Sequence, residues 1–279
     1  MSTASALFRA PEPLDPASHA ALRIAPLRDY SIAARMHAVF VAATEIPEAA
    51  LDFPIVFVHS GELDAAGAPV VSPVALLGLA QGENLYVEGS RWQARYVPAF
   101  LRRYPFVSGR RGPMIDMAWN GLSPIDGEPL YDEAGRPTPT LAAALDFLAR
   151  FEAEALRTRA FTARLAELDL LQPLHADATL ADGQTLRVEG FRVVDEDRLR
   201  PPDGPGRRAL IRAVEWVAAH EGSSFTEPSV GKGESATGAP AAATGTMAAP
   251  ATTEGPVEVS TSVMASLAAR ACIISVSSA

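Results

Sequence analysis

The hydrophobic pattern is most regular between Thr138 and Leu168, where large apolar residues mostly recur every three or four positions. This spacing places them on one face of a long helix. Thr138 can cap the N-terminus of that helix, and Pro139 suits its first position. The pattern drifts near Thr158, which leaves open a break there, and Pro173 is expected to stop the helix.

Shorter patterns predict strands. Two short apolar runs, at residues 54–58 and 73–79, indicate buried strands, and residues 82–89, bounded by glycines, indicate a third strand. Residues 174–180 and 186–193 alternate between apolar and polar side chains on either side of Asp182–Gly183, a pair typical of tight two-residue turns. The alternation slips at Gly190, which predicts a bulge in the returning strand of this hairpin.

The stretch RWQARYVPAFLRRYPF, residues 91–106, mixes basic and aromatic side chains. Pro98 can open a short helix that ends before Pro105. Three residues share one face of that helix at spacings of three and four: Phe100, Leu101 and Tyr104. We expect this face to pack in the core rather than to stack on nucleic-acid bases, with Arg102 and Arg103 lying away from it.

Six arginines fall in one span with no acidic residue between Glu88 and Asp116: Arg91, Arg95, Arg102, Arg103, Arg110 and Arg111. One interpretation is a solvated rim, partly paired with the acidic residues of the segment 126–133. The other is a site for phosphate, a carboxylate or an acidic partner, because the planar arginine fork binds such groups well. The sequence leaves both interpretations open.

Together these elements predict an α+β fold with a mixed or antiparallel sheet, a β-hairpin, one long helix and shorter helices, including a final amphipathic helix at residues 207–219. After His220 the composition shifts to Ala, Gly, Thr, Ser and Pro. Such a segment buries too little apolar surface to offset its ordering entropy. We therefore expect a domain at residues 1–220 and a disordered tail at residues 221–279.

The amino-acid composition disfavours some classes of protein function for this chain. The 279 residues carry a net charge of -9, which disfavours a nucleic-acid coat protein. The single cysteine, Cys272, allows no intramolecular disulfide and no multi-cysteine zinc site. The N-terminus lacks the pattern of a signal peptide, and no apolar run approaches the length of a transmembrane helix. The sequence thus predicts a soluble protein of a reducing compartment, the cytoplasm.

No motif identifies a reaction. The five histidines have no metal-ligand spacing, and neither a nucleophile elbow nor a phosphate-binding glycine loop is present. His59 follows a predicted strand, and Asp116 could join it and the span Arg91–Arg111 in a polar site. Asp132 and Gly135 suit a turn better than acid–base work. We expect no catalytic residues, no metal and no cofactor, with an enzyme at His59 and Asp116 as the alternative.

Several blocks resemble the bacterial SapC family. In chain order they are IPEAALDFPIVF, PVALLGLAQGENLYVEGSRWQARYVPAFLRRYPF, GEPLYDEAGRPTP, LAELDLLQPL and GFRVVDEDRLR, and the resemblance covers about residues 5–220. It implies a protein linked to surface-layer systems, and it brings no established catalytic residues. Relatives usually continue with an apolar helical segment after the position of His220, where this chain has low-complexity sequence.

Two function hypotheses follow. The resemblance implies a non-catalytic accessory or interaction protein of cell-surface export or uptake systems, binding another protein or an acidic ligand. The alternative is an enzyme of unknown reaction. A deep polar pocket joining His59, Asp116 and the arginine span would favour the enzyme, and a flat basic face rimmed by aromatics would favour the adaptor.

Overall fold

The computed structural model describes residues 7–64, 67–179, 185–199 and 273–278. The α-helices are α2 (Ile46–Ala49), α3 (Ala99–Arg102), α4 (Pro139–Glu167) and α5 (Glu196–Leu199), and the 3-10 helices are η1 (Ser31–Ala33) and η2 (Ala43–Glu45). The strands are β1 (Pro11–Pro13), β2 (Arg23–Ile24), β3 (Ala38–Phe40), β4 (Ile55–Leu63), β5 (Pro69–Leu76), β6 (Val87–Glu88), β7 (Arg91–Trp92), β8 (Phe106–Gly109), β9 (Gly112–Asp116), β10 (Leu122–Ser123), β11 (Glu128–Pro129), β12 (Leu171–Thr179), β13 (Thr185–Val194) and β14 (Ile273–Ser278).

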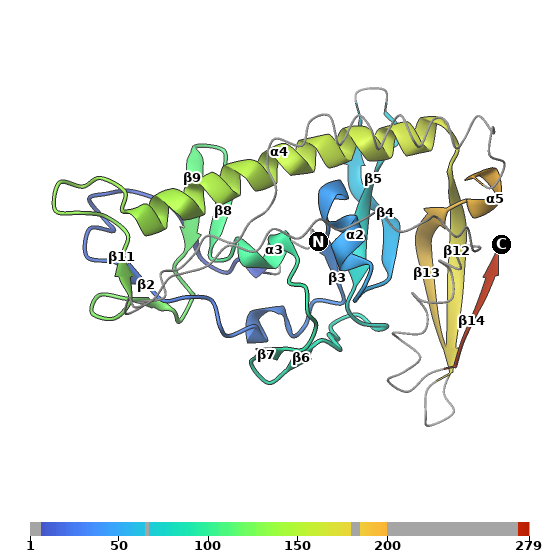
Figure 1. The fold of residues 1–279 in the computed structure, drawn as a ribbon, viewed down its shortest axis with the longest axis horizontal. Coiled ribbons are helices and arrows are strands. Elements are labelled where there is room, and N and C mark those ends of the chain that lie inside the picture. Colours follow the sequence, from blue (N-terminus) through green and yellow to red (C-terminus); the bar gives the residue numbers. More distant parts are fainter. Residues whose placement is uncertain (1–6, 65–66, 180–184, 200–272, 279) are drawn as a thin grey trace, which may run out of the picture.

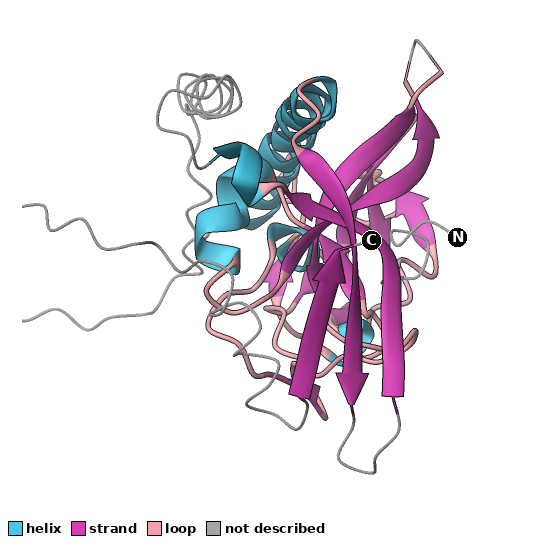
Figure 2. Cartoon of the chain, turned by 90° about the vertical axis from the view of Figure 1, so that its right-hand side faces the viewer, coloured by secondary structure: helices cyan, strands magenta, loops and turns pink. Residues whose placement is uncertain are grey.

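The α+β prediction is confirmed. A six-stranded antiparallel sheet has the order β14-β12-β13-β4-β5-β3, and the other strands form three small sheets. Figure 1 shows α4 running along much of the molecule, with the large sheet toward its C-terminal end, the strands β2, β8, β9 and β11 toward its N-terminal end, and β6 and β7 below its middle. Figure 2 shows the strands of the large sheet beside one another, with the helices to one side.

The long helix begins as its sequence predicts. The Thr138 side chain accepts a hydrogen bond from the Leu141 N–H, and Pro139 is the first helical residue. The helix ends at Glu167, earlier than the expected stop at Pro173.

Polar residues on the buried face explain why the pattern of α4 drifts without a break. Glu154, Thr158 and Thr162 are each about 1% exposed, and they occupy helical positions at which a core residue would be expected. The Thr158 hydroxyl donates to the Glu154 carbonyl and accepts a hydrogen bond from the Ala43 N–H at the start of η2. The Thr162 hydroxyl donates to the Val71 carbonyl in β5. These bonds join the helix to two other elements without interrupting it.

The hairpin of β12 and β13 is confirmed, and so is its bulge. Leu174 pairs with Phe191 and Ala176 pairs with Val188, so β13 carries one extra residue in this interval. Gly190 lies there with a φ of 85°, a conformation that glycine adopts at little cost. The turn at Asp182–Gly183 lies outside the described residues, as do the helix at 207–219 and residues 221–272 of the expected tail. The tail's residues 273–278 form β14, so this short part is a strand.

Two strand predictions need correction. The strand expected at 73–79 begins earlier, at Pro69, and ends at Leu76. The strand expected at 82–89 is reduced to β6. Before β6 the Asn84 side chain donates to the Ala33 carbonyl and accepts from the Tyr86 N–H. Side-chain bonds of this kind compete with strand pairing for the backbone.

Asp116 anchors the N-terminal segment at the end of β9. Its carboxylate is fully buried and accepts hydrogen bonds from the backbone N–H groups of Arg9, Ala10 and Ala118 and from the Tyr104 hydroxyl. Burial alone would raise the pKa of Asp116, but these hydrogen bonds to the ionised form hold it below its usual value. β1 pairs with β9 beside this anchor.

Candidate ligand-binding cavity

The helix predicted after Pro98 is confirmed as α3, and its apolar face lies in the core. Phe100, Leu101 and Tyr104 are at most 5% exposed. Phe100 meets Phe151 of α4 edge-on, with ring centroids 6.3 Å apart, and Tyr104 meets Trp119 at 5.8 Å. The interpretation of these rings as core residues rather than base-stacking platforms is therefore correct.

Arg102 and Arg103 are not solvated, contrary to the expectation that they lie away from the packed face. The side chain of Arg102 is 15% exposed and that of Arg103 is 6% exposed. The four-residue helix ends in a turn packed against α4, so both side chains are covered by aromatic rings and by neighbouring elements. The spacing of apolar residues predicted which face of α3 is packed in the core, but it could not show that other elements also cover Arg102 and Arg103.

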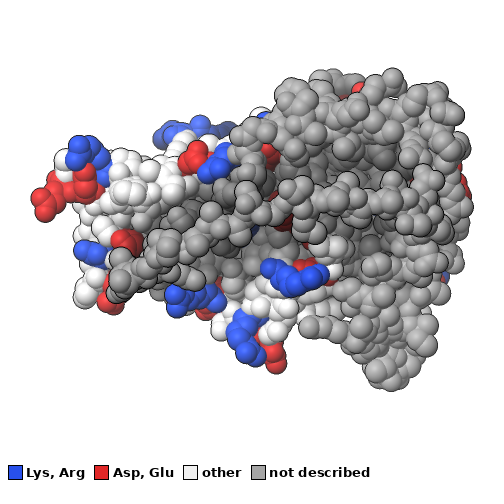
Figure 3. Space-filling view, in the orientation of Figure 1, with Lys and Arg blue, Asp and Glu red and all other residues white. Residues whose placement is uncertain are grey.

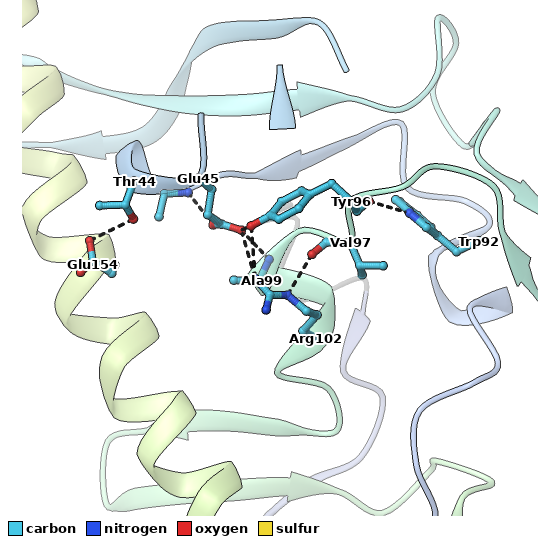
Figure 4. A network of polar contacts seen from close by, with 9 residues as sticks. Thr44, Glu45, Trp92, Tyr96, Val97, Ala99, Arg102 and Glu154 are labelled. Carbon is cyan, nitrogen blue, oxygen red and sulfur yellow. Dashed lines mark hydrogen bonds and ion pairs between the residues drawn. The ribbon is translucent and has the colours of Figure 1, made fainter. Parts of the chain in front are cut away.

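Arg102 belongs to a buried polar network (Figure 4). Its Nε donates to the Val97 carbonyl at 2.9 Å, and its Nη2 donates to the Tyr96 hydroxyl at 3.2 Å. The guanidinium also lies 3.9 Å from the carboxylate of Glu45 and 5.4 Å from the ring centroid of Phe147. The side chain is thus fixed by several contacts before any ligand arrives.

Glu45, the last residue of η2, is the centre of that network. It is 2% exposed, and its carboxylate accepts hydrogen bonds from the Tyr96 hydroxyl at 2.6 Å, the Ala99 N–H at 2.7 Å and the Ala42 N–H at 2.9 Å. Burial raises the pKa of Glu45, although these donors and Arg102 act against the rise. Because its contacts join η2 to α3, we interpret Glu45 as a structural carboxylate.

Arg103 lies in an aromatic enclosure and has little hydrogen-bond support. Its guanidinium lies 4.4 Å, 4.6 Å and 5.4 Å from the ring centroids of Phe100, Phe151 and Phe8. Within the described residues its Nε is buried without a hydrogen-bond partner, and its ion pair with the half-exposed Glu152 spans 3.8 Å. Burial lowers the pKa of Arg103 to about 10, while Glu152 opposes that shift. The residue therefore remains a buried cation that is weakly compensated.

Both arginines lie in the wall of a cavity of about 490 Å³. The other walls are residues 24–27, which comprise the end of β2 and the segment after it, Tyr104–Phe106, Trp119, Glu128 and five residues from the first turns of α4. Aromatic and aliphatic groups dominate this lining, and Glu128 is the one carboxylate that the described part of the chain contributes to it. A cavity of this size with apolar walls and a few polar groups is typical of sites for small molecules.

The chain matches the SapC family over residues 14–211, which is most of its length. The chain belongs to the SapC family. Neither a curated protein nor a solved structure matches it. Within the described residues, no helix is both long and apolar enough to cross a membrane. The match includes α3, α4 and every residue of the cavity wall.

The other four arginines of the span do not join the cavity wall of this SapC chain. Arg91 pairs with Glu88, and Arg95 pairs with Asp52. Arg110 and Arg111 are exposed between β8 and β9. Blue basic groups and red acidic groups are interspersed on the face seen in Figure 3. The acidic residues of segment 126–133 were expected to pair with arginines of this span. The observed partners of Arg91 and Arg95 are instead Glu88 and Asp52.

The alternative polar site is not assembled. His59 is exposed on β4 of the large sheet, whereas Asp116 is buried at the end of β9 in a small sheet. Neither residue lies in the cavity wall. Asp132 forms the predicted turn, accepting hydrogen bonds from the Ala134 and Arg136 N–H groups. Among the described residues, no three potential metal-ligating side chains gather.

Sequence reasoning missed Glu45 and most of the cavity wall. The segment containing Glu45 reads as part of an apolar block, and nothing local indicates that its carboxylate meets residues more than fifty positions away. Residues 24–27 and the first turns of α4 are also brought together only by the tertiary fold. Among the SapC blocks, the paired Arg102 and Arg103 beside aromatics were the signal that did point to this region.

Proposed function

We propose that this SapC chain is a non-catalytic accessory or interaction protein that binds an acidic molecule at the cavity beside Arg102 and Arg103. The observation that carries the proposal is the cavity wall, which combines apolar residues with the buried Arg103 and the partly buried Arg102. Arginine offers a fixed fork of donors to an anion without itself supplying a group that titrates near neutral pH. Such a wall suits binding better than acid–base chemistry.

The buried carboxylates support the same proposal. Glu45 and Asp116 accept several hydrogen bonds each, and Glu154 contacts Thr44 and Arg157. None of the three lies in the cavity wall. A general acid or base must reach the substrate within hydrogen-bond distance. These groups instead join elements of the fold.

Family membership supplies the biological setting of the proposal. We infer that the chain serves cell-surface systems of the surface-layer or outer-membrane kind, in export or uptake, as the family name suggests. A cytoplasmic place of action is consistent with the single cysteine, because no disulfide within the chain is needed. The exposed arginines at positions 91, 95, 110 and 111 remain candidates for contacts with an acidic protein partner.

The test is to purify the chain from the cells that make it and to identify what it retains. We expect an acidic molecule that is released by high salt or denaturation and is chemically unchanged after long incubation with the protein. An Arg103→Met variant should retain less of it, and Arg159→Met, which changes an arginine outside the cavity wall, should retain as much as the wild type. Conversion of the retained molecule to a product would contradict a non-catalytic role.

A further inference from the structure

We propose that the cavity accommodates an amphipathic monoanion, with a carboxylate head at Arg103 and an apolar body of medium-chain fatty-acid size between Trp119 and Phe147. This inference rests on the proposed function and names the class of its ligand. It follows from three features of the cavity. Arg103 has a donor without a hydrogen-bond partner within the described residues, the other walls are mainly apolar, and Arg102 is already held by contacts within the protein.

The expected position of the ligand's carboxylate head is inferred from the surroundings of Arg103. A guanidinium carries five N–H donors, and a buried donor without a partner destabilises the protein because its bonds to water are lost and not replaced. The aromatic rings around Arg103 contact its guanidinium but accept no conventional hydrogen bond, and Glu152 is too distant for one at 3.8 Å. A carboxylate entering from the cavity would supply hydrogen-bond acceptors and an opposite charge closer to the guanidinium than Glu152 at 3.8 Å.

The apolar body follows from the remaining walls. Ile24 and Leu27 lie on one side, and Ala144 and Phe147 of α4 lie on another. Trp119 completes the lining, and its ring packs against Tyr104. A hydrocarbon chain gains free energy by leaving water for such walls, whereas a sugar or a free phosphate would leave its polar groups unmatched there.

The expected single negative charge of the ligand is inferred from the contacts that Arg102 already makes. Its guanidinium already contacts the Tyr96 hydroxyl, the Val97 carbonyl and the Glu45 carboxylate. The cavity therefore offers one undercompensated cation rather than two, and Glu128 adds a negative charge to its wall. A dianionic head such as a phosphate monoester would bring an excess charge into an apolar site, which is costly. A monoanion balances Arg103.

The experiment is a calorimetric titration of the full chain with decanoate at neutral pH, at a concentration at which decanoate is monomeric. Decanol, decyltrimethylammonium, butyrate and decyl phosphate serve as comparison ligands. We expect saturable one-to-one binding of decanoate and binding at least about tenfold weaker for each comparison ligand, because each changes the charge or the apolar body. Equal or tighter binding of decyl phosphate or of the cationic amphiphile would overturn the inference, as would no binding of decanoate.

Three variants locate the site. Arg103→Met keeps a flexible apolar side chain among the rings but removes the charge, and it should weaken decanoate binding at least about tenfold. Ala144→Trp fills the cavity from α4 and should abolish binding. Arg159→Met should bind as the wild type does, because Arg159 pairs with Glu62 on an exposed surface. Decanoate binding that survives in both cavity variants would refute the location, and if Arg103→Met does not fold, Ala144→Trp decides.

The outcome is distinguishable from failure of the proposed function. If decanoate does not bind but Arg103→Met still loses the acidic molecule retained in cells, the chain is a binding protein and the ligand class is wrong. If Arg103→Met retains that molecule as well as the wild type does, the proposed function itself fails at this cavity.

Discussion

The anchor at Asp116 allows a quantitative test of the fold that supports the cavity. One carboxylate oxygen, Oδ1, accepts hydrogen bonds from Ala10 N at 2.8 Å and Ala118 N at 3.2 Å. The other, Oδ2, accepts from Arg9 N at 3.1 Å and the Tyr104 hydroxyl at 3.0 Å. Asp116→Asn keeps the shape of the side chain, replaces one acceptor by an NH2 group and removes the charge.

The expected cost follows from these contacts. If the amide oxygen of Asn takes the Oδ1 position, its NH2 group faces the Arg9 N–H, which is left without an acceptor at a cost of about 1–3 kcal/mol. The Tyr104 hydroxyl can reverse its role and accept from the NH2 group. Loss of the charge weakens the remaining bonds by about 1–2 kcal/mol in total. Asp116→Asn should therefore lower the free energy of unfolding by about 2–5 kcal/mol.

The pH dependence has a definite sign. The pKa of Asp116 in the folded state lies below its usual value, so its contribution to stability is present above the pKa of the unfolded chain and is lost as pH falls through the folded pKa. The asparagine variant has no such group. The difference in unfolding free energy between wild type and variant should be full at neutral pH and should shrink below about pH 4.

Urea unfolding of both proteins between neutral and acidic pH measures this difference. Tyr104→Phe removes one donor but keeps the carboxylate, and should cost about 1–2 kcal/mol at neutral pH. Asp126→Asn is the matched control at an exposed carboxylate and should change stability by less than about 0.5 kcal/mol. A destabilisation by Asp116→Asn below about 1 kcal/mol, or one that grows on acidification, would show that the ionised Asp116 does not anchor the N-terminal segment.

Three further predictions concern the core and the network beside the cavity. Phe100→Ala should lower the free energy of unfolding in urea by about 3–5 kcal/mol, and a loss below about 1 kcal/mol would mean that α3 is misoriented. Thr158→Val should cost about 1–3 kcal/mol in the same assay, because the Ala43 N–H loses its acceptor. Burial raises the pKa of Glu45. The unfolding free energy of the wild type relative to Glu45→Gln should therefore increase as the pH decreases toward about 4.3, which is the opposite of the trend for Asp116. A decrease of this difference over the same pH range would contradict a raised pKa for Glu45.

The elements that sequence predicted well are those whose signals are local. The Thr138 cap and Pro139 place the start of α4, and Gly190 marks the bulge in β13. Pro98 places the start of α3 because proline restricts the residue before it. In each case the deciding interactions lie within a few residues of the signal, so the printed sequence contains them.

The features that sequence could not predict depend on contacts between distant segments. Asn84 replaces an expected strand by bonding to Ala33, 51 positions away. Arg103 read as a surface residue because its helix is short, and only α4 and the N-terminal Phe8 reveal the aromatic enclosure around it. The cavity itself exists only where five separate segments meet. The six arginines therefore divided into buried and exposed groups that composition could not distinguish.

The most direct test of a binding cavity at Arg103 is the arginine side-chain region of a ¹H–¹⁵N NMR spectrum recorded during titration with decanoate. The Nε–H of Arg103 is buried without a hydrogen-bond partner within the described residues, and its signal is assigned as the one missing from Arg103→Met. If decanoate binds the Arg103 guanidinium, we expect this signal to shift and to saturate at one equivalent of decanoate, while the Arg159 signal stays in place. A signal from Arg103 that does not move while decanoate binds would show that the carboxylate does not bind at Arg103.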